Sequence, residues 1–252
     1  MKRIIFTKFL NEPFIIILYY IASIILFIIT YTYITALFEY LRISQIVAFI
    51  FAFSISILSL VFSPINIVIK EIERKRILEI GKDQVIYIFG IPFYFPSIKI
   101  EQRSNTYIAI NVGGALIPFI MSIILIESYF IYKYYYMIEL IIIIVFVTLI
   151  SKLFSKVIPS VGVAMHPIIP PLFSIFFSYI MFRSNILLLP LSTYISSTLG
   201  TIIGADLLNM KKIIDNNPLI ISIGGMGTFD GIYISGLLSL LLSFLIVPLP
   251  TR

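Results

Sequence analysis

Two aspartates stand inside long apolar runs, where ionised side chains are rare. Asp206 lies within residues 186–209 and Asp230 within residues 218–247. A carboxylate in the hydrocarbon of a bilayer costs about 3 kcal/mol unless it is paired, protonated or hydrated. Two neighbouring carboxyl groups can share a proton and act as general base and general acid, or they can relay protons or bind cations. We therefore treat Asp206 and Asp230 as the candidate catalytic pair, against the plainer alternative of a helix cap or an interhelical hydrogen bond.

Three more polar residues stand beside glycine or proline, and we take them as candidate binding residues. They are Asn111, His166 and Thr228. Irregular backbone at membrane depth is tolerated only where it is buried in protein or lines a wet cavity. We therefore expect Asn111, His166, Asp206 and Asp230 to surround one polar cavity in the cytoplasmic half of the protein.

The run from 223 to 228 contains three glycines and favours a break before the last helix. The helix would then begin near Thr228, a candidate N-cap, and would place Asp230 in its first turn. The alternative is a continuous helix from Leu219, which would place Asp230 deeper in the membrane.

The amino-acid composition limits which metal sites and which nucleophiles the protein can have. The chain has no cysteine and one histidine, which excludes a thiol nucleophile, a Cys-ligated metal and multi-His zinc motifs. The set Asn111, His166, Asp206 and Asp230 offers mixed oxygen and nitrogen ligands that suit several divalent ions, so no metal can be named. The cofactor stays unknown.

The composition indicates a membrane protein. Of 252 residues, 60% are hydrophobic and 12% charged, more apolar surface than a soluble domain of this length can bury. We expect one domain spanning 1–252, with the lipid bilayer as its partner. Nothing indicates nucleic acid, and protein partners stay open.

Seven apolar segments are predicted to cross the membrane, at about 20 residues per crossing. They are 14–37, 44–69, 106–126, 136–151, 170–183, 186–209 and 218–247. Fourteen of the 18 Lys and Arg residues fall in alternate loops, which places the N-terminus in the cytoplasm and the C-terminus outside the cell membrane. The first segment is too long for the apolar region of a signal peptide, so we interpret it as a retained helix.

The fold class predicted is therefore an all-α bundle of about seven spans, with a small cytoplasmic loop at 70–105 between helices two and three. Residues 70–76 read as a polar extension of helix two, whose basic side chains could contact anionic headgroups. Residues 85–96, around Gly90, predict a β-hairpin at the membrane interface.

Small residues recur every four positions on the last two predicted helices. The two stripes are Ser192, Ser196, Gly200 and Gly204, then Gly227, Gly231, Ser235, Ser239 and Ser243. Such residues let helix backbones approach closely in lipid, so we expect the two helices to pack antiparallel along them, unless each stripe faces another helix. Asp206 would point away from its stripe, which favours contact between the aspartates through a third segment or water.

Several of these motifs resemble an uncharacterised prokaryotic membrane family, domain of unknown function 1614, over roughly residues 80 to 245. The segments that carry the resemblance are Asn111-Val112-Gly113-Gly114-Ala115-Leu116-Ile117-Pro118, His166-Pro167 with Pro170-Pro171, Gly204-Ala205-Asp206-Leu207-Leu208 and Gly224-Gly225-Met226-Gly227-Thr228-Phe229-Asp230-Gly231. This resemblance implies a membrane domain and no particular activity.

A looser resemblance is to intramembrane aspartyl proteases of the presenilin, signal-peptide-peptidase and prepilin-peptidase group. These carry one aspartate on each of two helices, the second in Gly-x-Gly-Asp. Here Thr228-Phe229 separates Gly227 from Asp230, Ala205 stands where presenilin-like members have Tyr, and their Pro-Ala-Leu element is missing.

Three functions are compatible with these features. Broken helices, paired acids and a cavity are typical of proton- or ion-coupled transport. The alternatives are an intramembrane aspartyl hydrolase and a non-catalytic membrane scaffold in which the polar groups only join helices.

Overall fold

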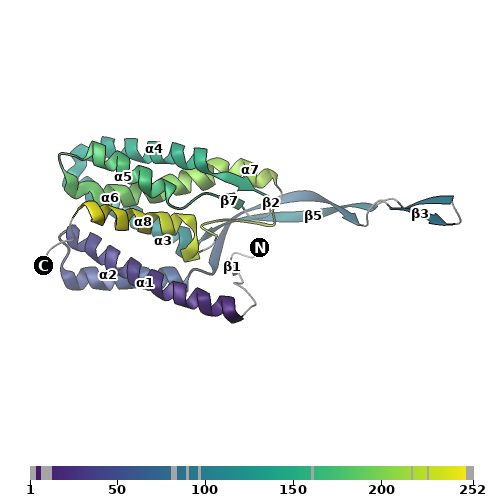
Figure 1. Cartoon of the computed structure of the whole chain (residues 1–252), viewed down its shortest axis with the longest axis horizontal. Coiled ribbons are helices and arrows are strands. Elements are labelled where there is room, and N and C mark those ends of the chain that lie inside the picture. The colour runs from purple at the N-terminus through teal and green to yellow at the C-terminus, as the bar shows by residue number, and fades with distance from the viewer. Residues whose placement is uncertain are drawn as a thin grey trace.

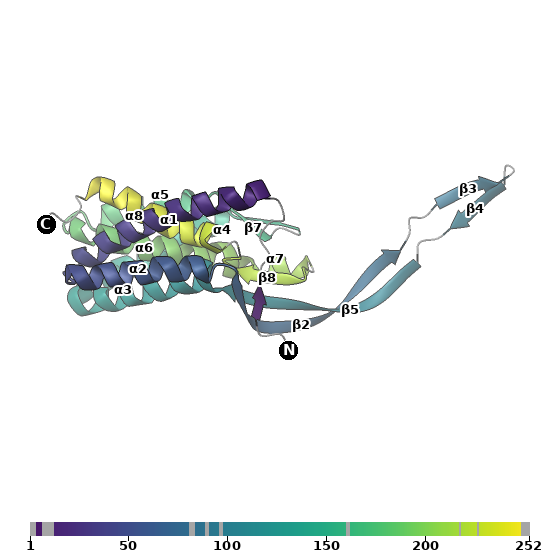
Figure 2. The same ribbon diagram turned by 90° about the horizontal axis from the view of Figure 1, so that it is seen from below.

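The chain folds into a bundle of helices from which a long β ribbon extends (Figures 1 and 2). The computed structural model describes residues 4–6, 13–80, 84–88, 91–95, 98–159, 162–216, 218–225 and 227–247. Its helices are α1 (Pro13–Tyr40), α2 (Gln45–Val61), α3 (Ile117–Lys133), α4 (Met137–Phe154), α5 (Ile169–Met181), α6 (Leu189–Thr201), α7 (Met210–Asp215) and α8 (Gly231–Ile246).

Three helices are long and apolar enough to cross a membrane: Ile17–Tyr40, Met137–Phe154 and Ile186–Asp215, the last running from before α6 through α7. Four shorter apolar helices accompany them in the described part of the chain. Large apolar side chains on the surface of the bundle are exposed, among them Ile46, Phe51, Leu153 and Leu245. A soluble protein rarely exposes so many, so these features indicate a membrane protein.

The predicted fold class is confirmed in part, because the chain is mostly helical but a four-stranded sheet adjoins the bundle. Its strands are β1 (Ile4–Phe6), β2 (Ile65–Ile80), β5 (Ile98–Asn111) and β8 (Ile220–Ile223), in the order β1-β2-β5-β8. β8 runs parallel to β5, and the other neighbours are antiparallel. A second, two-stranded sheet joins β6 (Lys156–Ile158) to β7 (Gly162–Ala164).

These strands take residues that the sequence analysis assigned to helices. Predicted helix two ends at Val61 rather than 69, because Pro64 cannot continue a helix and the next residues are β-branched. Residues 70–76 therefore lie in β2, and the predicted helical extension is wrong. Residues 106–111 and 220–223, assigned to helices three and seven, lie in β5 and β8.

The predicted hairpin is confirmed. β3 (Gln84–Ile88) pairs antiparallel with β4 (Ile91–Phe95), while Gly90 lies outside the described residues. Figure 2 shows this hairpin at the far end of the β2–β5 ribbon, beyond the helical bundle. Its contact with a membrane interface stays a prediction.

Helices α6 and α8 do pack antiparallel, and Ser235 of the predicted stripe on the last helix lies in their contact, but the α6 residues that it meets are not those of the predicted α6 stripe. Ser235 of α8 meets Ser197 and Thr201 of α6: its carbonyl accepts from Ser197 Oγ at 3.0 Å, and its hydroxyl lies 3.1 Å from that of Thr201. Gly200 and Gly204 instead face α4, where an added Cβ would meet Val147 and the carbonyl of Thr148 respectively. A spacing of four drifts around a helix of 3.6 residues per turn, so a stripe alone does not name its neighbour.

The two glycines assigned to the other stripe lie at the break before α8. Gly227 precedes the helix and packs against Ser63, while a Cβ at Gly231 would meet nothing within 4 Å. The stripe prediction fails for both because α8 begins only at Gly231.

Candidate functional site

Asp206 lies where the long helical rod containing α6 changes its winding. A π-helical turn, Ile202–Asp206, follows α6 and is succeeded by a 3₁₀ turn, Leu207–Asn209, before α7. Single π turns inside helices are often found at functional sites. The two abnormal turns place Asp206 at a point where the regular hydrogen-bond ladder of the helix is interrupted.

Side-chain donors satisfy carbonyls in this irregular segment. Asn209 Nδ2 donates to the carbonyl of Ala205 at 2.8 Å and to Ser155 Oγ at 2.7 Å. Lys152 Nζ donates to the carbonyl of Leu208 at 2.6 Å and also to Asn209 Oδ1. The end of α4 therefore holds the segment that carries Asp206. Lys152 and Asn209 were not predicted as part of the site, because a lysine at the end of a predicted helix indicates only the orientation of that helix in the membrane.

Asp230 is the N-cap of α8. Its backbone is extended, and its Oδ1 accepts a hydrogen bond from the Ile232 amide at 3.0 Å. The predicted break before the last helix is confirmed, but the capping residue is Asp230 rather than Thr228. Thr228 lies in the 3₁₀ turn Gly227–Phe229, and its side chain is outside the described residues.

Two glycine-rich segments interlock beside Asp230. Gly224 and Gly227 have positive φ angles of 71° and 63°, a conformation that side chains disfavour. A Cβ on Gly114 would overlap the carbonyl oxygens of both residues. The close approach of these backbones fixes where α8 begins.

Asn111 belongs to a buried hydrogen-bond cluster rather than to a cavity. Its Oδ1 accepts from the Gly114 amide at 2.7 Å, and its Nδ2 donates to the Ser63 carbonyl at 2.7 Å and to Asn66 Oδ1 at 3.2 Å. Asn66 Oδ1 also accepts from Ser222 Oγ at 2.5 Å. This Asn111 cluster connects the turn after α2 with β2, β5 and β8, and so joins the sheet to the bundle.

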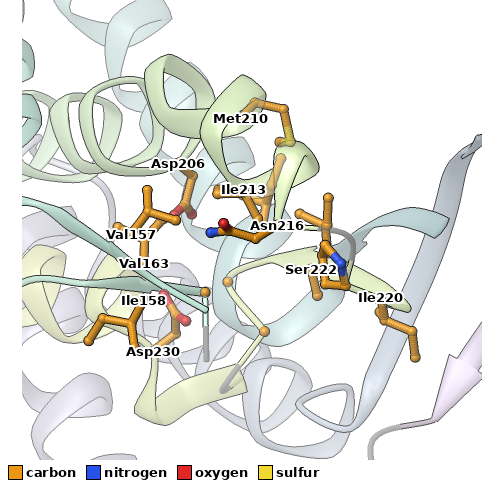
Figure 3. A pocket seen from close by; sticks show the side chains of 16 residues that line it. Val157, Ile158, Val163, Asp206, Met210, Ile213, Asn216, Ile220, Ser222 and Asp230 are labelled. Atoms are coloured by element: carbon orange, nitrogen blue, oxygen red, sulfur yellow. The ribbon is translucent and has the colours of Figure 1, made fainter. Parts of the chain in front are cut away.

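Asp206 and Asp230 line the same cavity, of about 300 Å³, from two different helices. Figure 3 shows Asp206 and Asp230 entering it from opposite sides, with Val157 and Val163 of the β6–β7 hairpin on one wall and Ser222 of β8 on another. Gly224, at the break before α8, lines this cavity together with both aspartates. A second cavity of about 310 Å³ is also lined by both aspartates.

His166 is separated from this pair. Its side chain is exposed, its Nδ1 lies 3.5 Å from the Ile168 amide, and it lines neither cavity. The expected single cavity closed by Asn111, His166 and the two aspartates is therefore not formed. Among the described residues, no group of three or more His, Cys, Asp or Glu side chains is placed to hold a metal ion.

Comparisons with known proteins add a family and no activity. Neither the curated proteins nor the solved structures contain a significant match to the chain. A family model described as "Protein of unknown function (DUF1614)" matches residues 60–242, a span that includes the Asn111 cluster, both aspartates and the glycine-rich break. The protein therefore belongs to the DUF1614 family, as its motifs predicted.

Proposed function

We propose that this protein is a membrane aspartyl hydrolase that cleaves peptide bonds, with Asp206 and Asp230 as its catalytic pair. The observation that carries the proposal is that two carboxyl groups from different helical segments line one cavity. Both sit where helix geometry is interrupted, at a π turn and at an N-cap. Such placement gives each acid access to a cavity that a regular helix would close.

The chemistry needs only these two groups and water. One carboxylate removes a proton from water as the water oxygen attacks the carbonyl carbon, while the other, protonated, donates to the carbonyl oxygen. The tetrahedral intermediate then collapses, the C–N bond breaks, and the leaving nitrogen takes a proton from the pair. The two acids must reach the reacting atoms directly or through one water in the bound state.

The cavity also has a surface suited to a peptide backbone. β8 is the last strand in the described order of its sheet, and residues 220–225 line the cavity. An open strand edge offers backbone donors and acceptors to an extended peptide, which adds as a further strand. A peptide bound along β8 would lead toward the aspartates, since Gly224 and Gly225, which follow β8, line the same cavity as both acids.

The membrane placement is part of the proposal. Seven apolar helices, an excess of Lys and Arg in alternate loops and an exposed apolar surface support seven crossings with a cytoplasmic N-terminus and an outer C-terminus. The aspartates then lie near the cytoplasmic side of the cell membrane, where water can enter the cavity. Basic residues at that side would contact anionic headgroups.

Cleavage of a reporter peptide by the reconstituted protein tests the proposal. The wild-type chain is expected to cleave a transmembrane reporter, and Asp206→Asn and Asp230→Asn are each expected to lower the rate by about 10³-fold or more. Asp215→Asn is the matched control, because Asp215 is exposed at the end of α7. Full cleavage by both cavity variants would reject a hydrolase. Variants that alter only thermal stability would identify a scaffold.

Proton- or ion-coupled transport is the second candidate, because the same two acids line two cavities rather than one. Acidic residues between two cavities are the arrangement that a relay of protons or cations requires. In liposomes with an imposed pH or sodium gradient, transport predicts a flux that Asp206→Asn abolishes without any peptide cleavage. Absence of flux in the wild-type protein would reject this candidate.

A further inference from the structure

The second cavity differs from the first in the chemistry of its walls. The two share Val163, Asp206 and Asp230. Beyond the shared residues, the first cavity is lined mainly by apolar residues but also by the polar side chains of Asn216 and Ser222. The second is lined by described residues that are nearly all apolar, including Ala164, Met165, Ala205, Phe229 and Ile234. The second cavity is therefore the more apolar of the two spaces that the acid pair borders.

Among the described residues that line the second cavity, Thr201 carries the hydroxyl side chain, and this hydroxyl is already engaged. Thr201 Oγ1 donates to the carbonyl of Ser197 at 2.7 Å and lies 3.1 Å from Ser235 Oγ. An occupant of this cavity therefore meets an apolar surface and, at one side, the carboxyl groups of Asp206 and Asp230. A ligand fits both surfaces if its apolar group fills the cavity and a polar group attached to it lies at the two carboxyl groups.

We infer that the second cavity is a specificity subsite, which holds an apolar side chain of the substrate next to the peptide bond that the aspartates attack. This inference rests on the proposed hydrolase function and adds the substrate class: a peptide with a bulky aliphatic or aromatic residue at the cleavage site. A polar or charged side chain is rejected there, because it would lose water without gaining partners.

Two residues from different elements set the size of the subsite. Ala164 lies in β7 and lines only the second cavity of the two, so Ala164→Phe fills the subsite. Ile234 lies in the first turn of α8, and Ile234→Ala enlarges it. Lys156→Phe is the matched control, because Lys156 pairs with Ala164 in the same hairpin but is exposed and lines neither cavity.

The test is photolabelling of the full chain in nanodiscs with a short synthetic peptide carrying photo-leucine. The Asp206→Asn background is used, so that labelling does not require cleavage. We expect crosslinks to β7 or α8, a loss of labelling of at least fivefold in Ala164→Phe, and retained labelling in Lys156→Phe. Ile234→Ala is expected to take up a larger benzoylphenylalanine probe at least threefold better than the unmodified subsite.

The outcomes separate the subsite from the catalytic function. The subsite is overturned if neither Ala164→Phe nor Ile234→Ala changes the extent of labelling. It is also overturned if a peptide with a photoactivatable polar residue labels the protein equally well. Both conclusions hold even where the wild-type chain cleaves the reporter peptide. Labelling that follows both substitutions in a chain that never cleaves retains the subsite and overturns the hydrolase. Labelling that a fatty acid displaces while a leucine-rich peptide does not would assign the cavity to an acyl chain and overturn the peptide substrate.

Discussion

The two segments that carry the aspartates both interrupt regular helix at the cavity, but they are held in place by different contacts. Asp206 lies in an interruption within a continuous helical rod, which side chains of Lys152 and Asn209 hold in place. Asp230 lies at the start of a new helix, positioned by backbones that meet at Gly114 and Gly227. A segment held by side chains can be adjusted by substitution, whereas one held by touching backbones tolerates almost no added atom.

The acids also differ in what they do for the fold. Asp230 accepts a cap hydrogen bond from Ile232, while Asp206 makes no side-chain cap bond at its own turn. Chemistry and stability are therefore separable at Asp206 and combined at Asp230. The four substitutions that follow test this difference, beginning with the region around Asp230.

Asn111→Ala is expected to have the largest effect, because it leaves the Ser63 carbonyl, the Gly114 amide and Asn66 Oδ1 without their Asn111 partner in a buried place. The expected loss is about 4 kcal/mol in the free energy of unfolding. An SDS titration followed by circular dichroism measures it. Asn105→Ala is the control on the same strand, since Asn105 is only partly buried and donates to Glu71. Equal losses in the two variants would contradict a special role for the Asn111 cluster.

Gly114→Ala is expected to lower the free energy of unfolding by about 3 kcal/mol, because the new methyl group overlaps the carbonyl oxygens of Gly224 and Gly227. The break before α8 must then shift, and Asp230 with it. Gly231→Ala provides the comparison, as its methyl group meets nothing within 4 Å. The same titration measures both variants. A Gly114→Ala protein as stable as Gly231→Ala would show that the two glycine-rich segments do not touch.

The parts of the fold that could be predicted are those with a strong local sequence pattern. The apolar helices and the break before Asp230 have strong signatures, in run length and in glycine. Residues 65–69 are one of the places where the analysis failed, since Ile-rich stretches suit a buried helix and a strand equally. Once β2 is missed, its partners β5 and β8 are missed as well.

The site shows the same limit at the level of single residues. Asp206 and Asp230 could be predicted as site residues because each is an ionisable residue within a long apolar run of the sequence. The π turn at Ile202–Asp206 has no sequence signature. The roles of Lys152 and Asn209, which hydrogen bond to the segment around it, could therefore not be predicted. His166 and Asn111 were selected for neighbouring Pro and Gly, but such backbone also serves loops and buried clusters, and the structure places both outside the two cavities.

Lys152→Met tests the segment held by side chains and is expected to cost about 1 kcal/mol, since the lysine is partly exposed and its bonds are screened. The local effect should exceed the global one. Hydrogen exchange at the amides of the Leu207–Asn209 turn is expected to rise about tenfold while exchange in α6 is unchanged. Lys156→Met, an exposed lysine on β6, should leave exchange unaltered. Unchanged exchange in Lys152→Met would mean that the π turn persists without support from α4.

The smallest expected effect separates the two roles of Asp230. Asparagine caps helices about as well as aspartate, whereas alanine does not. Asp230→Asn should therefore leave the free energy of unfolding within a few tenths of a kcal/mol of wild type, while Asp230→Ala should lower it by about 1 kcal/mol. At Asp206, which makes no cap bond, Asn and Ala variants should be equally stable to within about 0.5 kcal/mol. SDS titrations of the four variants measure these differences. A loss in Asp230→Asn as large as in Asp230→Ala would mean that the charge, rather than the cap bond, holds the start of α8, and the proposed separation of chemistry from folding at this residue would not hold.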